Sequence, residues 1–127
     1  MTQDEMKQRT KKFALRIIKL VESLPKTRTS DVLGKQLLRS GTSVGANYRA
    51  ACRGKSLPDF IAKLGIVEEE ADESLYWIEL LVEASQVKNE LVINLLDEAN
   101  QIVAIVVSAI RTSKSKRNPK SEIRNPK

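Results

Sequence analysis

Two acidic side chains near the centre of the sequence are the residues best suited to chemistry. Glu70 and Glu73 lie in "EEEADESLYW", residues 68–77, and a helix would place them on one side together with Ile66, Trp77 and Ala84. Two carboxylates beside an indole ring could act as a general acid and a general base. The same pair is equally suited to bind an arginine across a helix or subunit contact, and we favour this structural role.

The sequence contains no histidine and a single cysteine, which restricts the remaining chemistry. Without histidine the chain lacks the usual general base near neutral pH and the commonest ligand for transition metals. Cys52 has no histidine to activate it, and we expect it to be a small buried residue. One cysteine cannot form an internal disulfide, which favours a cytoplasmic protein. We therefore expect neither an enzyme nor a cofactor or metal site.

Basic side chains are the second group with a possible function. Eight of them fall on one side of the predicted first or second helix: Arg9, Lys12, Arg16, Lys19, Lys35, Arg39, Arg49 and Arg53. Residues 31–56 carry five basic side chains and one acidic side chain. Such stripes are typical of proteins that bind a polyanion, but a run of charge is also the ordinary solvated face of a helix. No aromatic residues alternate with the basic ones, so stacking on bases is not expected.

Hydrophobic periodicity near 3.6 residues predicts the elements that must position these side chains. Helices are expected at about 4–24, 30–53, 57–85 and 90–112. Ser30 and Ser56 are expected to cap the second and third helices, and the short connections favour antiparallel neighbours. The sequence therefore predicts an all-α protein, an up-down-up-down four-helix bundle over residues 1–112.

The end of the chain has a different composition from the predicted bundle. Residues 113–127 form a short basic segment in which "RNPK" occurs twice, and we expect a disordered tail. The longest apolar-rich run, "IVAIVVSAI" at 102–110, is shorter than the roughly 20 residues that cross a bilayer. We therefore expect no association with a membrane.

The predicted second helix contains unusually small residues in "RSGTSVGAN", residues 39–47. A glycine inside a helix costs about 1 kcal/mol relative to alanine. Small residues allow two helix backbones to approach closely, so we expect this helix to make contacts on more than one side. Asn47 lies at the edge of the apolar stripe, where its amide could bond a carboxylate such as Glu70 or Glu73.

A combination of short motifs resembles the 23S rRNA intervening-sequence protein family, a group of bacterial four-helix-bundle proteins. The resemblance covers about residues 5–112 and rests on Arg39-Ser40, Ser43-Val44-Gly45-Ala46-Asn47, Ser56, Asp59-Phe60 and Glu70-Ala71-Asp72-Glu73-Ser74-Leu75-Tyr76-Trp77. It implies a left-handed bundle that assembles as a homopentameric ring. Some genes of this family lie inside rRNA intervening sequences, and a related bundle protein assists the reverse transcriptase of diversity-generating retroelements. The family has no accepted catalytic residues.

Three functions remain open from the sequence. The first is a non-enzymatic oligomer that binds RNA or DNA mainly through phosphate contacts of the basic stripes. The second is a scaffold whose basic faces bind another protein, such as a polymerase-type enzyme. The third is an enzyme that uses Glu70 and Glu73. We favour the first, and we assign a structural or interface role to Ser43, Asn47, Ile66, Glu70, Glu73 and Trp77.

Overall fold

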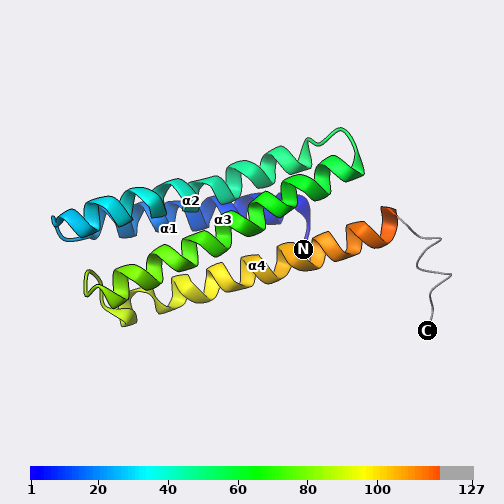
Figure 1. Ribbon diagram of the computed structural model, residues 1–127. Helices are drawn as coiled ribbons and strands as arrows, with labels where there is room; N and C mark the ends of the chain where they lie inside the picture. The colour runs from blue at the N-terminus through cyan, green and yellow to red at the C-terminus, as the bar shows by residue number, and fades with distance from the viewer. Residues whose placement is uncertain (118–127) are drawn as a thin grey trace.

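A computed structural model describes residues 1–117 as four long helices joined by short loops (Figure 1). The helices are α1 (Gln3–Ser23), α2 (Arg28–Cys52), α3 (Leu57–Glu83) and α4 (Asn89–Arg117). The described residues form no β-strand. Consecutive helices run in opposite directions, and α2 packs against both α1 and α3, while α4 packs against α3 and, over a shorter length, against α1 (Figure 1). The predicted four-helix bundle is therefore confirmed.

The core of the bundle consists of the apolar faces that the periodicity predicts. Its fully buried side chains include Phe13 and Ile17 from α1, Leu37 and Val44 from α2, Leu64, Val67, Ala71 and Ile78 from α3, and Val92, Ala99, Ile102 and Val106 from α4. Five hydroxyl side chains, at least one on each helix, are also buried, and the sequence analysis did not anticipate this burial: Thr10, Ser30, Ser40, Ser74 and Ser113. Two of the five bond each other across α2 and α3, where the Ser74 hydroxyl donates to the Ser40 hydroxyl at 2.9 Å.

Hydroxyl side chains cap the first three helices, one of them at a different residue from the prediction. Ser56 caps α3 as expected, because its side chain accepts a hydrogen bond from the Asp59 amide. The cap of α2 is Thr27 and not Ser30, so the helix begins at Arg28. Ser30 instead lies buried in the first turn and donates to Gln86 Oε1 at 2.8 Å. Gln86, in the loop between α3 and α4, thus accepts a hydrogen bond from both hydroxyls, that of the cap Thr27 and that of the buried Ser30.

The fourth helix continues beyond the predicted end at residue 112. Helix α4 runs to Arg117, so residues 113–117 are helical and do not belong to a tail. Ser113 is 8% exposed and packs on the bundle, and cations in the last turns interact favourably with the helix dipole. The rest of the predicted tail, residues 118–127, lies outside the described residues.

Two glycines of α2 allow α1 to approach closely. A Cβ atom on Gly41 would lie 2.8 Å from both Cγ atoms of Ile17. A Cβ atom on Gly45 would lie 3.1 Å from the Thr10 hydroxyl. The opposite side of the same stretch contacts α3 through Ser40. The expected contacts on two sides of α2 are therefore present, and they account for the glycines inside this helix.

The end of α2 also holds the single cysteine. Cys52 is half-buried and packs against the core, so the expectation of full burial is only partly right. It lies near the last turn of the helix, where less of the bundle covers it. Burial raises the pKa of Tyr48, and a hydrogen bond with the Cys52 thiol raises it further.

Helix α4 is the one element of residues 1–117 that is long and apolar enough to cross a membrane, with a mean hydropathy of 1.5 over its most apolar window. Length and composition are weak grounds for such a role, because core helices pass the same test. In this structure α4 places Val92, Ala99 and Ile102 in the core of the bundle.

Candidate nucleic-acid interface

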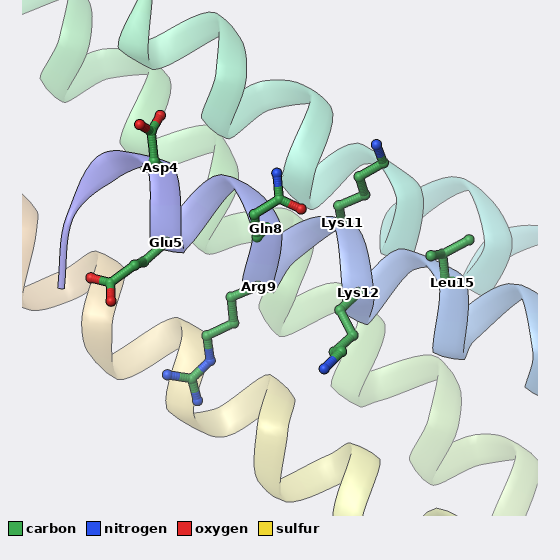
Figure 2. Close-up of a pocket in the computed structure, with 7 residues that line it drawn as sticks. All are labelled: Asp4, Glu5, Gln8, Arg9, Lys11, Lys12 and Leu15. Carbon is green, nitrogen blue, oxygen red and sulfur yellow. The ribbon is translucent and has the colours of Figure 1, made fainter.

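The two sides of α1 carry different basic side chains, and each side faces a different helix. In Figure 2, Lys11 extends to the α2 side of α1, whereas Arg9 and Lys12 point to the α4 side. Arg16 lies on the α4 side as well, since its positive charge helps to lower the pKa of Glu98 on α4. The predicted first-helix stripe therefore follows the seam between α1 and α4, and it does not form one surface with the stripe on α2.

Arg9 is engaged in the bundle and holds α1 to α4. Its Nε donates to Glu98 Oε2 at 2.6 Å, and its Nη2 donates to Glu98 Oε1 at 2.8 Å and to Gln101 at 2.7 Å. The side chains of Arg9 and Glu98 are 23% and 18% exposed. The hydrogen bonds from Arg9 hold the pKa of Glu98 below its usual value. Arg9 is therefore a structural cation in this bundle.

Arg39 is also engaged, at the seam between α2 and α3. Its Nη1 donates to Glu70 at 3.2 Å, its Nη2 donates to Glu73, and the Trp77 indole N–H donates to the same Glu73 oxygen at 3.2 Å. In this structure Glu70 and Glu73 therefore pair with an arginine across the contact between two helices. Lys35 has a weaker engagement, an exposed pair with Asp31 at 3.2 Å.

The remaining residues of the predicted interface set are Ser43 and Asn47 on α2 and Ile66 and Trp77 on α3. The Asn47 amide donates to the backbone carbonyl of Ser43 at 2.8 Å, so the expected bond to Glu70 or Glu73 is absent. The carbonyl four residues earlier in the helix is the nearer acceptor. Ile66 is 41% exposed, and Trp77 is half-buried. The rings of Trp77 and Tyr76 pack edge to face, with 5.1 Å between their centroids.

A groove of about 530 Å³ lies between α1 and α2, and we call it the α1–α2 groove. Its lining consists of Lys7, Gln8, Lys11, Ala14, Thr42, Gly45, Ala46, Arg49 and Arg53. Lys7 and Lys11 come from α1, Arg49 comes from the last turn of α2, and Arg53 is the residue that caps the end of α2. The small residues Ala14, Gly45 and Ala46 leave the space between the two helices open.

Four cations and no acid line this groove. Lys7 approaches Asp4 at 4.0 Å, but that carboxylate is 96% exposed. Among residues 1–117, no carboxylate lies within 4.0 Å of the basic atoms of Lys11, Arg49 or Arg53. The groove therefore presents uncompensated positive charge on two rigid helices, an arrangement suited to bind phosphate groups.

The comparisons with known proteins agree on the family. The family model of the 23S rRNA-intervening sequence protein matches residues 2–108. This chain belongs to that family. A solved structure, a protein of unknown function from the S23 ribosomal protein family of Bacteroides thetaiotaomicron VPI-5482, is 37% identical, with a TM-score of 0.81. The match covers 87% of this chain and 99% of that one. No curated protein matches the chain.

Five of the motif residues on which the family resemblance rests meet at the α2–α3 seam. Arg39 and Ser40 come from α2, and Glu70, Glu73 and Ser74 come from α3. In this member of the 23S rRNA-intervening sequence protein family, these five residues thus hold α2 and α3 together. Within residues 1–117, no group of three His, Cys, Asp or Glu side chains is placed to hold a metal ion.

Sequence reasoning missed half of the cations in the groove of this family member. Arg49 and Arg53 were predicted, whereas Lys7 and Lys11 were not assigned to any surface. One signal was available: Ala14 lies three residues after Lys11, and an alanine on the flank of an apolar face marks the side where another helix approaches closely. A helical wheel of one helix does not say which neighbour each flank will meet.

Proposed function

We propose that this protein is a non-enzymatic, oligomeric bundle that binds RNA or DNA through phosphate contacts in the α1–α2 groove. The observation that supports the proposal is that Lys11, Arg49 and Arg53 line this groove beside Lys7 and have no carboxylate within 4.0 Å among residues 1–117. Contacts of this kind position a nucleic acid without reading its sequence. Arg9 and Arg39 are expected to contribute less, because carboxylates of the bundle hold their side chains.

The proposed assembly is a homopentamer of left-handed bundles, as the family resemblance implies. Exposed apolar side chains support the existence of an interface, since Ile66 and Tyr76 of α3 are 41% and 54% exposed and Tyr76 contacts the half-buried Trp77. In a ring, each subunit repeats the groove, and contacts that are weak individually add through their effective concentration.

The test is a salt titration of nucleic-acid binding with a double charge reversal. If one groove neutralises four phosphates, the slope of log K against log salt is about −3.6, and raising salt from about 50 to 200 mM weakens binding roughly 10²-fold. Arg49→Glu with Arg53→Glu is expected to abolish binding.

The matched control is Lys26→Glu with Lys88→Glu, which changes the net charge equally at exposed positions outside the groove. This control is expected to retain most of the affinity, and circular dichroism should show both variants folded. A folded Arg49→Glu, Arg53→Glu variant that binds as tightly as wild type would show that the groove is an ordinary solvated surface.

A further inference from the structure

We infer that the α1–α2 groove binds the backbone of a double-stranded nucleic acid in preference to a single strand. This inference rests on the proposed function and adds the class of nucleic acid. It follows from what the groove contains, two rows of cations on helices, and from what its nine lining residues lack, an aromatic ring.

The aromatic side chains of this chain are all placed elsewhere. Phe13 and Tyr48 are buried in the core, Phe60 packs against it, and Tyr76 and Trp77 lie on α3. Proteins that bind single strands without sequence preference stack the bases on aromatic rings. In this groove a single strand would gain phosphate contacts alone, and it would still lose the conformational freedom of its backbone.

The cations are spaced and held in a way that suits a rigid backbone. Lys7 and Lys11 lie one helical turn apart, about 6 Å along the axis of α1. Across the groove, Arg49 lies in the last turn of α2 and Arg53 caps that helix. The two rows are fixed relative to each other because Gly41 and Gly45 allow α1 and α2 to pack closely. A duplex already holds its phosphates at fixed positions, so it loses less freedom when it binds to fixed cations.

Charge density favours the duplex as well. A duplex carries one phosphate per about 1.7 Å of its axis, compared with about 3.4 Å for one strand, and each contact releases more counterions. The uncharged polar groups of the groove, Gln8 and Thr42, can hydrogen-bond to phosphate or sugar oxygens. The small residues between them carry no group that reads base edges. The expected ligand is therefore duplex RNA or DNA of any sequence.

The experiment measures fluorescence anisotropy of a labelled 20-base-pair duplex, as RNA and as DNA, against an unstructured U20 or T20 strand. Both duplexes are expected to bind at least tenfold more tightly than the strands, with a salt slope of about −3.6 for a four-contact duplex site against about −2.8 for a single strand. Equal affinity for duplex and strand, with both lost in Arg49→Glu, Arg53→Glu, would overturn the duplex inference and leave the proposed function standing. Failure of every probe to bind would overturn the proposed function itself.

A second variant tests the physical reason for the preference. Ala46 is exposed and lines the groove, so Ala46→Trp introduces the missing stacking surface. This variant is expected to raise affinity for the T20 strand about tenfold or more and to leave duplex affinity unchanged or lower. An equal gain for both ligands would contradict the inference, because the lack of an aromatic ring would then not explain the preference.

Discussion

At the scale of single residues, Gly41 of α2 shows why a helix contains a residue that lowers its stability. Gly41 faces Ile17 so closely that even a methyl group does not fit without movement. Gly65 of α3 provides the contrast, since a Cβ atom there would meet nothing within 4 Å. Only the first of these glycines is explained by packing within the chain.

Alanine substitution should separate the two positions. Gly41→Ala is expected to destabilise the bundle by about 1–3 kcal/mol because it overpacks the contact with Ile17. Gly65→Ala is expected to stabilise it by about 0.5–1 kcal/mol because alanine is the better helix former. Urea denaturation followed by circular dichroism measures both, and a stabilising Gly41→Ala would show that Ile17 moves aside without cost.

A second residue-level prediction concerns the ion pair between Arg9 and Glu98. The pKa of Glu98 is lowered in the folded protein, chiefly by the hydrogen bonds from Arg9. A lowered pKa means that the pair stabilises the fold above the unfolded-state value of 4.5 and that this contribution is lost as pH falls through the folded value.

Glu98→Gln should therefore reduce the melting temperature near pH 7 and flatten its decline below about pH 5. Thermal denaturation from pH 7 to pH 3 measures the effect. Glu83→Gln is the matched control, because Glu83 is exposed and forms no salt bridge within residues 1–117, and it should retain the wild-type profile. Parallel profiles for wild type and Glu98→Gln would show that the pair does not contribute to acid sensitivity.

At the scale of elements, the α2–α3 seam combines a buried hydroxyl pair with the more exposed cluster of Arg39, Glu70 and Glu73. Removing one partner of a fully buried ion pair costs about 3–5 kcal/mol. The Arg39 side chain is 48% exposed, so solvent screens this cluster and reduces the cost.

Glu70→Ala is accordingly expected to destabilise the bundle by roughly 1–2 kcal/mol, whereas Glu79→Ala on the exposed face of α3 should change stability by less than about 0.5 kcal/mol. Denaturant titration of both variants tests this, and the fluorescence of Trp77, which bonds Glu73, reports directly on the seam. Equal small effects would mean that Glu70 acts as another surface acid.

The elements themselves were largely predictable because each apolar face repeats with the helical period. The end of α4 was not, since after Ile110 a single small residue, Ser113, continues the buried face. The start of α2 was missed for another reason: Thr27 and Ser30 are both good caps, and Gln86 in a distant loop bonds both. The sequence around residues 27–30 does not show that Gln86 bonds these two hydroxyls.

The candidate site was half predictable for a related reason. The face opposite the core is fixed by periodicity alone, so Arg49 and Arg53 were placed correctly on the surface of α2. Which helix lies against each side of α1 or α2 depends on how the four helices are arranged around the bundle. That arrangement assigns Lys7 and Lys11 to the groove, turns Arg9 toward Glu98 and turns Arg39 toward α3.

At the scale of the whole molecule, assembly and binding should be separable. The exposed apolar side chains of α3, Ile66 and Tyr76, lie on a different helix from the cations of the α1–α2 groove. Ile66→Glu places a charge in the proposed interface without touching the core. Ile93→Glu makes the same change on α4, where Ile93 is 53% exposed, and serves as the matched control.

Light scattering of the wild type is expected to give a mass near that of a pentamer, five chains of 14.2 kDa. Ile66→Glu should give a monomer mass with unchanged helical content, whereas Ile93→Glu should remain assembled. The monomer keeps one intact groove, so it should still bind duplex, but with an affinity lower by about 10²–10⁴-fold because the effective concentration of neighbouring grooves is lost. A monomeric wild type at micromolar concentration would reject the assembly. A monomeric Ile66→Glu that binds as tightly as wild type would show that a single groove provides the whole affinity.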